Sequence, residues 1–244
     1  MNESFIRTEM LLGTTSIERL RRSRVAIFGI GGVGSYVAEA LARAGIGHLT
    51  LIDHDTIAES NLNRQIHADM ETIGILKTEA MQARILRINP QAEVCAISVY
   101  ATPENLCDLL VDGIDYVVDA IDSITTKLAL AVYCHATGIS EISSMGMANK
   151  LYPERITLAD LYETSVCPLA RVMRTELRKR GVPRLPVCYS TEPARTPILP
   201  AQNPDISDDA TAPQRRMLGS VSFVPSAAGL IIAGKVIRDI CQIV

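Results

Sequence analysis

The sequence predicts an α/β fold: a Rossmann-like, doubly wound, mostly parallel sheet with helices on both faces. Short apolar segments alternate with helical segments along the first 150 residues, which is the pattern of a parallel sheet covered on both sides. The first apolar segment, residues 24–29, ends in a glycine-rich turn, as in nucleotide-binding βαβ units. The chain has 244 residues, 48% of them hydrophobic, which is enough for one sizeable core.

The expected strands are short apolar runs, and the expected helices are longer segments of helix-forming residues. The strands of the first part are residues 24–29, 48–53, 93–99, 115–121 and 139–145. The helices between them are residues 33–44, 76–88, 103–110 and 125–137. After residue 150 we expect a strand at 155–158, a basic helix at 169–180, a closing strand at 219–224 and a closing helix at 227–240.

We expect a single domain over residues 1–244, organised in three parts. Residues 1–150 form the nucleotide-binding core, residues 151–218 an excursion on the substrate side, and residues 219–244 the closing strand and helix. Residues 181–213 contain seven of the twelve prolines. This stretch therefore predicts a long irregular insertion before the last strand and helix.

Composition and charge exclude several classes of protein. The net charge of −3 shows no overall excess of Lys and Arg, so nucleic-acid binding would need a local basic patch. None of the six cysteines forms a C-x-x-C pair, which argues against a four-cysteine zinc site. The N-terminus has no signal-like apolar segment, and we expect a cytoplasmic protein. Charged residues interrupt the apolar C-terminus, so we expect no membrane insertion.

The glycine turn predicts a nucleotide site. Gly29 permits the tight turn, Gly31 and Gly32 let the backbone approach a phosphate, and Gly34 lets the following helix pack closely against the strand. The helix N-terminus then offers free N–H groups to an anion. Asp53 ends the second strand, where a carboxylate accepts hydrogen bonds from ribose hydroxyls. The turn alone does not separate NAD from ATP.

A polar, cationic segment after the second strand favours ATP. It contains Ser60, Asn61, Asn63 and Arg64, and Lys77 follows. A pyrophosphate leaving the α-phosphorus of ATP needs positive charge, which an Arg fork and a Lys ammonium supply. Asp122, just past the fourth strand, is expected to bind Mg²⁺. Taken one at a time, these residues also fit a solvated loop, a surface lysine and a helix cap.

These motifs together resemble the ubiquitin-activating-enzyme superfamily, which includes ThiF-type bacterial adenylyltransferases. The resemblance covers about residues 5–145 and implies that ATP adenylates a carboxylate. It implies catalytic roles for Arg64, Lys77 and Asp122, with Asp122 as the metal ligand. Arg7 falls where the superfamily has an arginine that reaches the ATP of a partner subunit, which implies a homodimer. The residues expected to bind ATP are Gly29, Gly31, Gly32, Gly34, Asp53, Asp55, Ser60, Asn61, Asn63, Arg64, Lys77, Asp122 and Ser123.

One subfamily, the tRNA threonylcarbamoyladenosine dehydratases, is more similar than the others. The shared segments are residues 45–47, 64–68, 87–90, 118–123, 189–192 and 218–224. The resemblance implies ATP-dependent dehydration, by cyclisation, of threonylcarbamoyladenosine at position 37 of tRNA through an acyl-adenylate. It also suggests a sulfur-transfer protein as a partner. The chain departs from the subfamily at Cys167, where relatives often have Asp.

A basic segment is the candidate surface for tRNA. It begins in the helix expected at 169–180, and its cations recur partly at helical spacing. On charge alone, a solvated helix face is an equally good interpretation. The predicted tRNA-binding residues are Arg171, Arg174, Arg178, Lys179 and Arg180, with Arg184, Arg215 and Arg216 as additions.

Three other functions stay open at this point. In the first, the enzyme adenylates the C-terminal glycine of a ubiquitin-like or sulfur-carrier protein, and Cys167 or Cys188 accepts the acyl group. The second is an NAD-dependent oxidoreductase, and the third a non-catalytic binding protein. The four histidines do not pair with Cys or Glu at metal-ligand spacing. We expect His67 to shape the Arg64 loop and the others to be structural.

Overall fold

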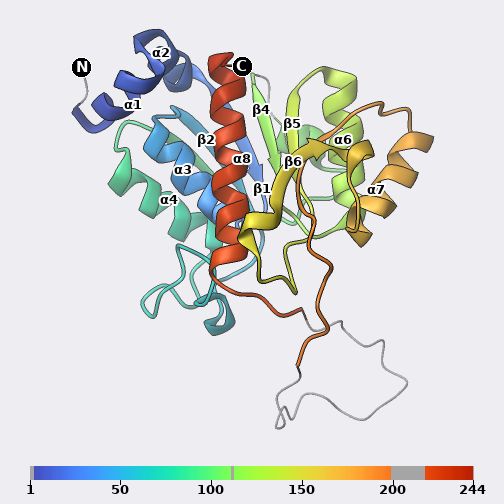
Figure 1. Ribbon diagram of the computed structural model, residues 1–244. Helices are drawn as coiled ribbons and strands as arrows, with labels where there is room; N and C mark the ends of the chain where they lie inside the picture. The colour runs from blue at the N-terminus through green and yellow to red at the C-terminus, as the bar shows by residue number, and fades with distance from the viewer. Residues whose placement is uncertain (1–2, 111–112, 199–217, 244) are drawn as a thin grey trace.

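The computed structural model describes residues 3–110, 113–198 and 218–243. A seven-stranded sheet with the order β3-β2-β1-β4-β5-β7-β6 forms its centre (Figure 1). All neighbouring strands are parallel except β6 and β7, which are antiparallel. The strands are β1 (Arg24–Phe28), β2 (His48–Ile52), β3 (Glu93–Ile97), β4 (Tyr116–Asp119), β5 (Ser140–Ser144), β6 (Ile156–Asp160) and β7 (Pro186–Ser190). This architecture confirms the predicted fold class.

Helices cover both faces of the sheet. Figure 1 shows α8 along the front of the sheet, with α3 and α4 to its left and α6 and α7 to the right. The first two helices, α1 and α2, were not predicted from the sequence. The α-helices are α1 (Ile6–Leu12), α2 (Thr14–Arg22), α3 (Gly34–Ala44), α4 (Lys77–Ile88), α5 (Leu106–Leu109), α6 (Ile124–Thr137), α7 (Pro168–Lys179) and α8 (Phe223–Cys241). Short 3₁₀ helices are η1 (Glu3–Phe5), η2 (Glu59–Asn61), η3 (Pro153–Arg155) and η4 (Leu161–Glu163).

Strand β1 shows why the central strands are mostly apolar along their length. Val25 and Ile27 pack into the core beneath α3 and α8, whereas Ala26 and Phe28 pack into the core beneath α5 and α6. Side chains alternate between the two faces of a strand, and both faces are covered here. A strand buried on both sides needs apolar residues throughout.

The closing strand predicted at residues 219–224 is wrong. Residues 218–222 have no strand structure, and α8 begins at Phe223. Pro225 falls in the first turn of α8, where a missing N–H costs no helical hydrogen bond. The strand that extends the parallel sheet is instead β7, inside the proline-rich segment. Pro186 opens β7, a position that a strand tolerates.

The excursion predicted at residues 151–218 is more regular than expected. Its described part contains β6, α7 and β7, which extend the same sheet. Residues 199–217, which include Arg215 and Arg216, lie outside the described part of the chain.

The helix predicted at 103–110 shortens to α5, because Asn105 accepts a hydrogen bond from the Thr102 N–H in a turn before it. In the described residues, no helix is both long and apolar enough to cross a membrane.

A fully buried ion pair joins β4 to α6 near the carboxyl edge of the sheet. Lys127 Nζ lies 2.8 Å from Asp119 Oδ2, and both side chains are completely buried. Ser143 Oγ donates to the same carboxylate oxygen (2.6 Å), and Lys127 also donates to the Ser144 carbonyl (2.9 Å). Burying two charges is costly, and these hydrogen bonds offset part of the cost.

We predict that Lys127→Met strongly destabilises the protein, by about 3–5 kcal/mol, because it leaves the Asp119 carboxylate buried without its counter-charge. The double variant Lys127→Met with Asp119→Asn removes both charges and should recover part of this loss. Urea unfolding of the wild type and the two variants measures the difference. A double variant as unstable as Lys127→Met alone would show that the uncompensated charge is not the cause.

Candidate functional site

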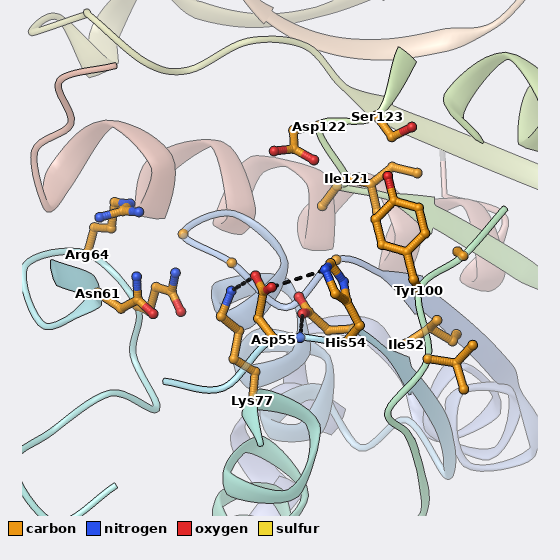
Figure 2. A pocket seen from close by; sticks show the side chains of 18 residues that line it. Ile52, His54, Asp55, Asn61, Arg64, Lys77, Tyr100, Ile121, Asp122 and Ser123 are labelled. Atoms are coloured by element: carbon orange, nitrogen blue, oxygen red, sulfur yellow. Dashed lines mark hydrogen bonds and ion pairs between the residues drawn. The ribbon is translucent and has the colours of Figure 1, made fainter. Parts of the chain in front are cut away.

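A cavity of about 340 Å³ opens at the carboxyl edge of the sheet (Figure 2). It lies where β1 stands between β2 and β4, and the strand order reverses there. Ligands of doubly wound sheets bind at such a switch point. The residues that line the cavity are Gly29, Gly31, Gly32, Ile52, Asp53, His54, Asp55, Asn61, Arg64, Gln65, Lys77, Val99, Tyr100, Ala101, Ala120, Ile121, Asp122 and Ser123.

The glycine turn brings three backbone segments too close together for side chains. Gly29 has a φ of +87°, and a Cβ there would lie 2.7 Å from the Ala120 carbonyl oxygen. A Cβ on Gly34 would lie 1.8 Å from the Gly29 carbonyl oxygen. This close approach allows α3 to start directly against the turn. Gly34 itself does not line the cavity. Only glycine fits such close approaches.

Asp53 supports the glycine turn from the end of β2. Its Oδ2 accepts a hydrogen bond from the Ile30 N–H (2.7 Å), and its Oδ1 accepts one from the Asp55 N–H (2.9 Å). The side chain is partly exposed to the cavity. Asp53 is therefore held in a fixed orientation beside the turn, and its carboxylate has further lone pairs for a ribose hydroxyl.

Lys77 points into the cavity from the first residue of α4. Its ammonium lies 2.5 Å from Asp55 Oδ2, and the Lys77 side chain is 8% exposed. The other oxygen of Asp55 lies 3.2 Å from His54 Nε2. Figure 2 shows these three side chains converging on one side of the cavity. A phosphate entering here competes with Asp55 for the lysine.

Arg64 faces the cavity from the segment after η2. Its Nη1 donates to the Ser60 carbonyl (2.8 Å) and to Asn63 Oδ1 (2.9 Å). Ser60 and Asn63, which were predicted to bind ATP, are not among the residues that line the cavity; both accept hydrogen bonds from Arg64. Asn61 does line the cavity, and its Oδ1 accepts a hydrogen bond from the Ala58 N–H. Gly32 lies against Pro225 of α8, since a Cβ on Gly32 would lie 3.2 Å from Pro225 Cβ.

Asp122 and Ser123 close the cavity from the loop after β4. Ser123 caps α6 by accepting a hydrogen bond from the Thr126 N–H. Ser123, and not Asp122, is therefore the residue that caps α6, and the carboxylate of Asp122 is exposed. Asp53, His54 and Asp55 form the one described group of side chains whose potential metal-ligand atoms gather within 4.8 Å of one another. Asp55 is already paired with Lys77.

The opposite end of the cavity is apolar and was not predicted. Ile52, Val99, Tyr100 and Ala101 line it. The Tyr100 ring meets the His54 ring edge to face, with 4.6 Å between centroids. The cavity therefore has a cationic end at Arg64 and Lys77 and an apolar, aromatic end suited to a base. Val99 and Tyr100 follow β3, and no glycine or charge marks them in the sequence.

His67 lies beneath the Arg64 segment. It is 3% exposed, and neither ring nitrogen has a hydrogen-bond partner among the described residues. Burial, followed by the nearby charges of Lys77 and Arg84, lowers the pKa of His67 to about 4. The ring is therefore neutral at physiological pH. It does not line the cavity, and its expected role in shaping the Arg64 loop stays a prediction.

Other predicted residues lie away from the cavity. Arg7 is exposed on α1 and does not line the cavity of its own chain. Cys167, at the start of α7, lies beside a second hollow and is 4% exposed. Cys188 is fully buried in β7, and burial raises its pKa to about 12.

The predicted tRNA-binding residues differ in how free they are. Arg174 Nη1 donates to the Thr164 carbonyl (2.9 Å) and to the Thr164 hydroxyl. Lys179 and Arg180 are both paired with Glu176. Arg178 is exposed and lies 5.3 Å from the centroid of the Tyr162 ring. Arg171 is exposed, and its side chain has no hydrogen-bond or ion-pair partner among the described residues.

Comparison with known proteins identifies close relatives. The ThiF family model matches residues 6–243. The tRNA threonylcarbamoyladenosine dehydratase of Bacillus subtilis is 41% identical over 247 residues, covering 99% of this chain and 96% of that protein. Its counterpart in Haemophilus influenzae is 40% identical over 235 residues, covering 93% and 89%. The crystal structure of the E. coli tRNA N6-threonylcarbamoyladenosine dehydratase in complex with ATP has a TM-score of 0.86 at 31% identity, covering 98% of this chain and 94% of that one.

We predict that His67 makes stability fall as the pH drops from about 6.5 towards 4. The unfolded chain binds a proton at its ordinary pKa of about 6.5, whereas the folded chain, with its lowered pKa, does not. The stability is therefore complete above pH 6.5 and is lost as pH falls, by up to about 3 kcal/mol. Denaturant unfolding between pH 7.5 and 4.5 should show a flatter pH dependence in His67→Gln. The exposed His135→Gln is the matched control, and equal slopes in both variants would rule out His67 as the source.

Proposed function

Because this chain belongs to the ThiF family, we propose that it catalyses the ATP-dependent dehydration of threonylcarbamoyladenosine at position 37 of tRNA. The reaction proceeds through an acyl-adenylate. The observation that carries the proposal is the two-ended cavity, which joins an apolar end to a cationic end across the glycine turn. ATP has the matching polarity, with an apolar base at one end and a triphosphate at the other. Two relatives that align over more than nine-tenths of this chain carry the name of this activity.

ATP binds with its adenine near Ile52, Val99 and Tyr100 and its ribose at Asp53. The glycine turn then faces the phosphates with N–H groups at the start of α3, where the helix dipole favours negative charge. Arg64 and Lys77 lie beyond the turn, at the end where the β- and γ-phosphates extend. This placement leaves the α-phosphorus accessible to an attacking carboxylate.

In the first step, an oxygen of the substrate carboxylate attacks the α-phosphorus and forms a new P–O bond. The bond from the α-phosphorus to the pyrophosphate oxygen breaks, and pyrophosphate leaves with the electron pair. Negative charge grows on the leaving group, and Arg64 and Lys77 stabilise it. Arg64 is already oriented by Ser60 and Asn63, and Lys77 is held at the cavity by Asp55, which the phosphate must replace.

A magnesium ion fits this site. Asp122 offers an exposed carboxylate at the cavity wall that no helix cap uses, and Mg²⁺ prefers one or two carboxylates together with substrate phosphates. We therefore propose Asp122 as its protein ligand. The ion, when bound, neutralises charge on the phosphate oxygens.

In the second step, the neighbouring ureido nitrogen of the same nucleoside attacks the acyl carbon. A C–N bond forms, the bond from the acyl carbon to the AMP oxygen breaks, and the nitrogen loses its proton. The sum of the two steps is the loss of one water, driven by the cleavage of ATP to AMP and pyrophosphate. The nucleophile is tethered to the electrophile, so the effective concentration is high and no enzyme thiol is required.

A homodimer completes the proposal. Ile6, Met10 and Leu11 are exposed on α1, the helix that carries Arg7, and an exposed apolar patch of this kind suits an interface with a second copy. Arg7 would then reach the ATP of the partner.

We place the enzyme in the cytoplasm, where tRNA is available; its six free cysteines suit a reducing compartment. A sulfur-transfer partner rests on the resemblance alone.

The runner-up is adenylation of a carrier protein with transfer to a cysteine. Both candidate thiols are unfavourably placed, because an acyl-accepting cysteine must be accessible and ionised. Cys188 is fully buried with a raised pKa, and Cys167 is 4% exposed. Cys167→Ala and Cys188→Ala variants that keep full dehydration activity would exclude this route. If the purified protein retained NAD, an oxidoreductase would be favoured instead. If it catalysed no ATP–pyrophosphate exchange, a non-catalytic binding protein would be favoured.

We predict that the protein, incubated with ATP, Mg²⁺ and tRNA, removes one water from threonylcarbamoyladenosine, as detected by mass spectrometry of the digested tRNA. Arg64→Gln and Lys77→Met should lower kcat by about 10²-fold each, since each removes one charge that stabilises the leaving pyrophosphate. Arg22→Gln, an exposed arginine on α2 away from the cavity, is the matched control. An unchanged tRNA mass, together with adenylation of a carrier protein, would overturn the proposed substrate.

We further predict that Arg171→Gln with Arg178→Gln weakens tRNA binding and lowers the salt slope of log K by about one per phosphate contact. Arg174→Gln should mainly lower thermal stability, since Arg174 is engaged with Thr164. Fluorescence anisotropy with tRNA across a salt series measures both effects. The same affinity and slope in the double variant and the wild type would remove α7 from the tRNA surface.

A further inference from the structure

Two arginines are held against one tyrosine ring at the surface. The guanidinium carbon of Arg155 lies 5.0 Å from the centroid of the Tyr152 ring, and that of Arg195 lies 5.4 Å from it. Arg195 also donates to the Tyr152 hydroxyl (3.3 Å). All three side chains are exposed. Cation–π contact orients a guanidinium but leaves its N–H edge free for an anion.

The backbone beneath this cluster is rigidly connected through Glu192. The buried carboxylate of Glu192 accepts hydrogen bonds from the N–H groups of Leu151 and Tyr152, at 3.0 Å each to Oε2. The buried Lys150 ammonium donates to the Glu192 carbonyl. The Thr191 N–H donates to the Arg155 carbonyl (3.0 Å). The segments that carry the arginines are thus fixed to each other although they lie far apart in the sequence.

A chain of hydrogen bonds links the cluster to the ATP cavity. The Arg195 N–H donates to the Asn149 carbonyl (2.8 Å), and Asn149 exchanges backbone and side-chain hydrogen bonds with Gly219 (2.8 and 2.7 Å). The next residue, Ser220, accepts a hydrogen bond from Asn63 Nδ2 (3.1 Å). Asn63 in turn orients Arg64. The cluster and the cavity therefore share one hydrogen-bonded framework on the carboxyl side of the sheet.

The charges of the cluster suit an extended polyanion. The buried Glu192 carboxylate accepts hydrogen bonds from two backbone N–H groups and forms an ion pair with Arg195, whose Nε lies 3.4 Å away. No described ion pair engages Arg155. Two oriented guanidiniums on a rigid surface match successive phosphates of a nucleic-acid backbone, because Arg binds phosphate as a fork. This geometry needs no overall positive charge and is compatible with a net charge of −3.

We infer that Tyr152, Arg155 and Arg195 form a docking site for the phosphate backbone of tRNA beside the nucleotide that enters the cavity. The inference rests on the proposed function and extends it. Arg155 and Arg195 contact phosphates, and Tyr152 is a positioning residue that orients both guanidiniums. Rigid connection to Arg64 fixes the distance between the docked backbone and the reacting centre.

The test uses the full-length enzyme with tRNA, ATP and Mg²⁺. Arg155→Gln and Arg195→Gln should each raise KM for tRNA about fivefold with little change in kcat, and each should lower the salt slope of tRNA binding by about one. Tyr152→Leu should reproduce part of both effects, whereas Tyr152→Phe retains the ring and should be milder. Arg155→Lys keeps the charge and should recover most of the salt slope. ATP affinity should stay unchanged in every variant.

Arg22→Gln is again the matched control, since it removes one exposed arginine from α2. Direct measurement of tRNA binding by fluorescence anisotropy separates the inferred docking site from the proposed dehydration reaction. A wild type that binds tRNA through these arginines but does not dehydrate it would overturn the proposed reaction and leave the docking site standing. A wild type that dehydrates tRNA while the Arg155 and Arg195 variants keep its KM and salt slope would overturn the docking site. If the Arg155 and Arg195 variants lost binding to an acidic protein but kept their affinity for tRNA, the docking site for tRNA would also be overturned.

Discussion

The site depends on a close approach of backbone segments around the glycine turn. Gly34 places the start of α3 against the Gly29 carbonyl, and Gly29 places the end of β1 against Ala120 beyond β4. Asp53 then joins the turn to the end of β2 through the Ile30 N–H. The ends of β1, β2 and β4 thus meet at one point. The segments that follow β2 and β4 carry Lys77 and Asp122, and Tyr100 follows the neighbouring strand β3. A side chain at Gly29 or Gly34 would separate these loops and open the cavity.

The sequence predicts the centre of this fold well because its physics is local. Strands β1, β2 and β4 are buried on both faces, so their apolar runs stand out, and the glycine turn has a steric cause that is visible in one segment. The end of the sheet was mispredicted because its strand is decided by pairing with distant strands, which a local pattern does not show. Pro186 and its neighbouring prolines suggested irregular chain, while Val221 and Val224 suggested a strand. Pairing with β5 and β6 decides the outcome at β7, and that pairing is a tertiary property.

Prediction of the site divides along the same line. Arg64, Lys77, Asp53 and Asp122 were expected from charge and order along the chain, and all four line the cavity. Ser60 and Asn63 share their segment but hydrogen-bond to Arg64 and do not line the cavity, which spacing alone does not reveal. Tyr100 and the buried Lys127 were missed, because an aromatic residue after a strand and a lysine in a helix are ordinary features. Only the packed structure shows that one faces a ligand site and the other neutralises Asp119.

The cations of this acidic protein differ in what holds them, and this difference suggests their order of use. Lys77 is paired with Asp55, so an anion that binds this lysine must compete with the Asp55 carboxylate. Arg155 and Arg195 both rest on an aromatic ring that does not cancel their charge; Arg195 is also ion-paired with Glu192, whereas no described ion pair engages Arg155, which is therefore available at the surface from the start. Attraction of a polyanion therefore acts first at the exposed arginines. In the cavity, the charge of Lys77 is balanced by Asp55, whereas Arg64 is bonded, among the described residues, only to the neutral oxygens of Ser60 and Asn63.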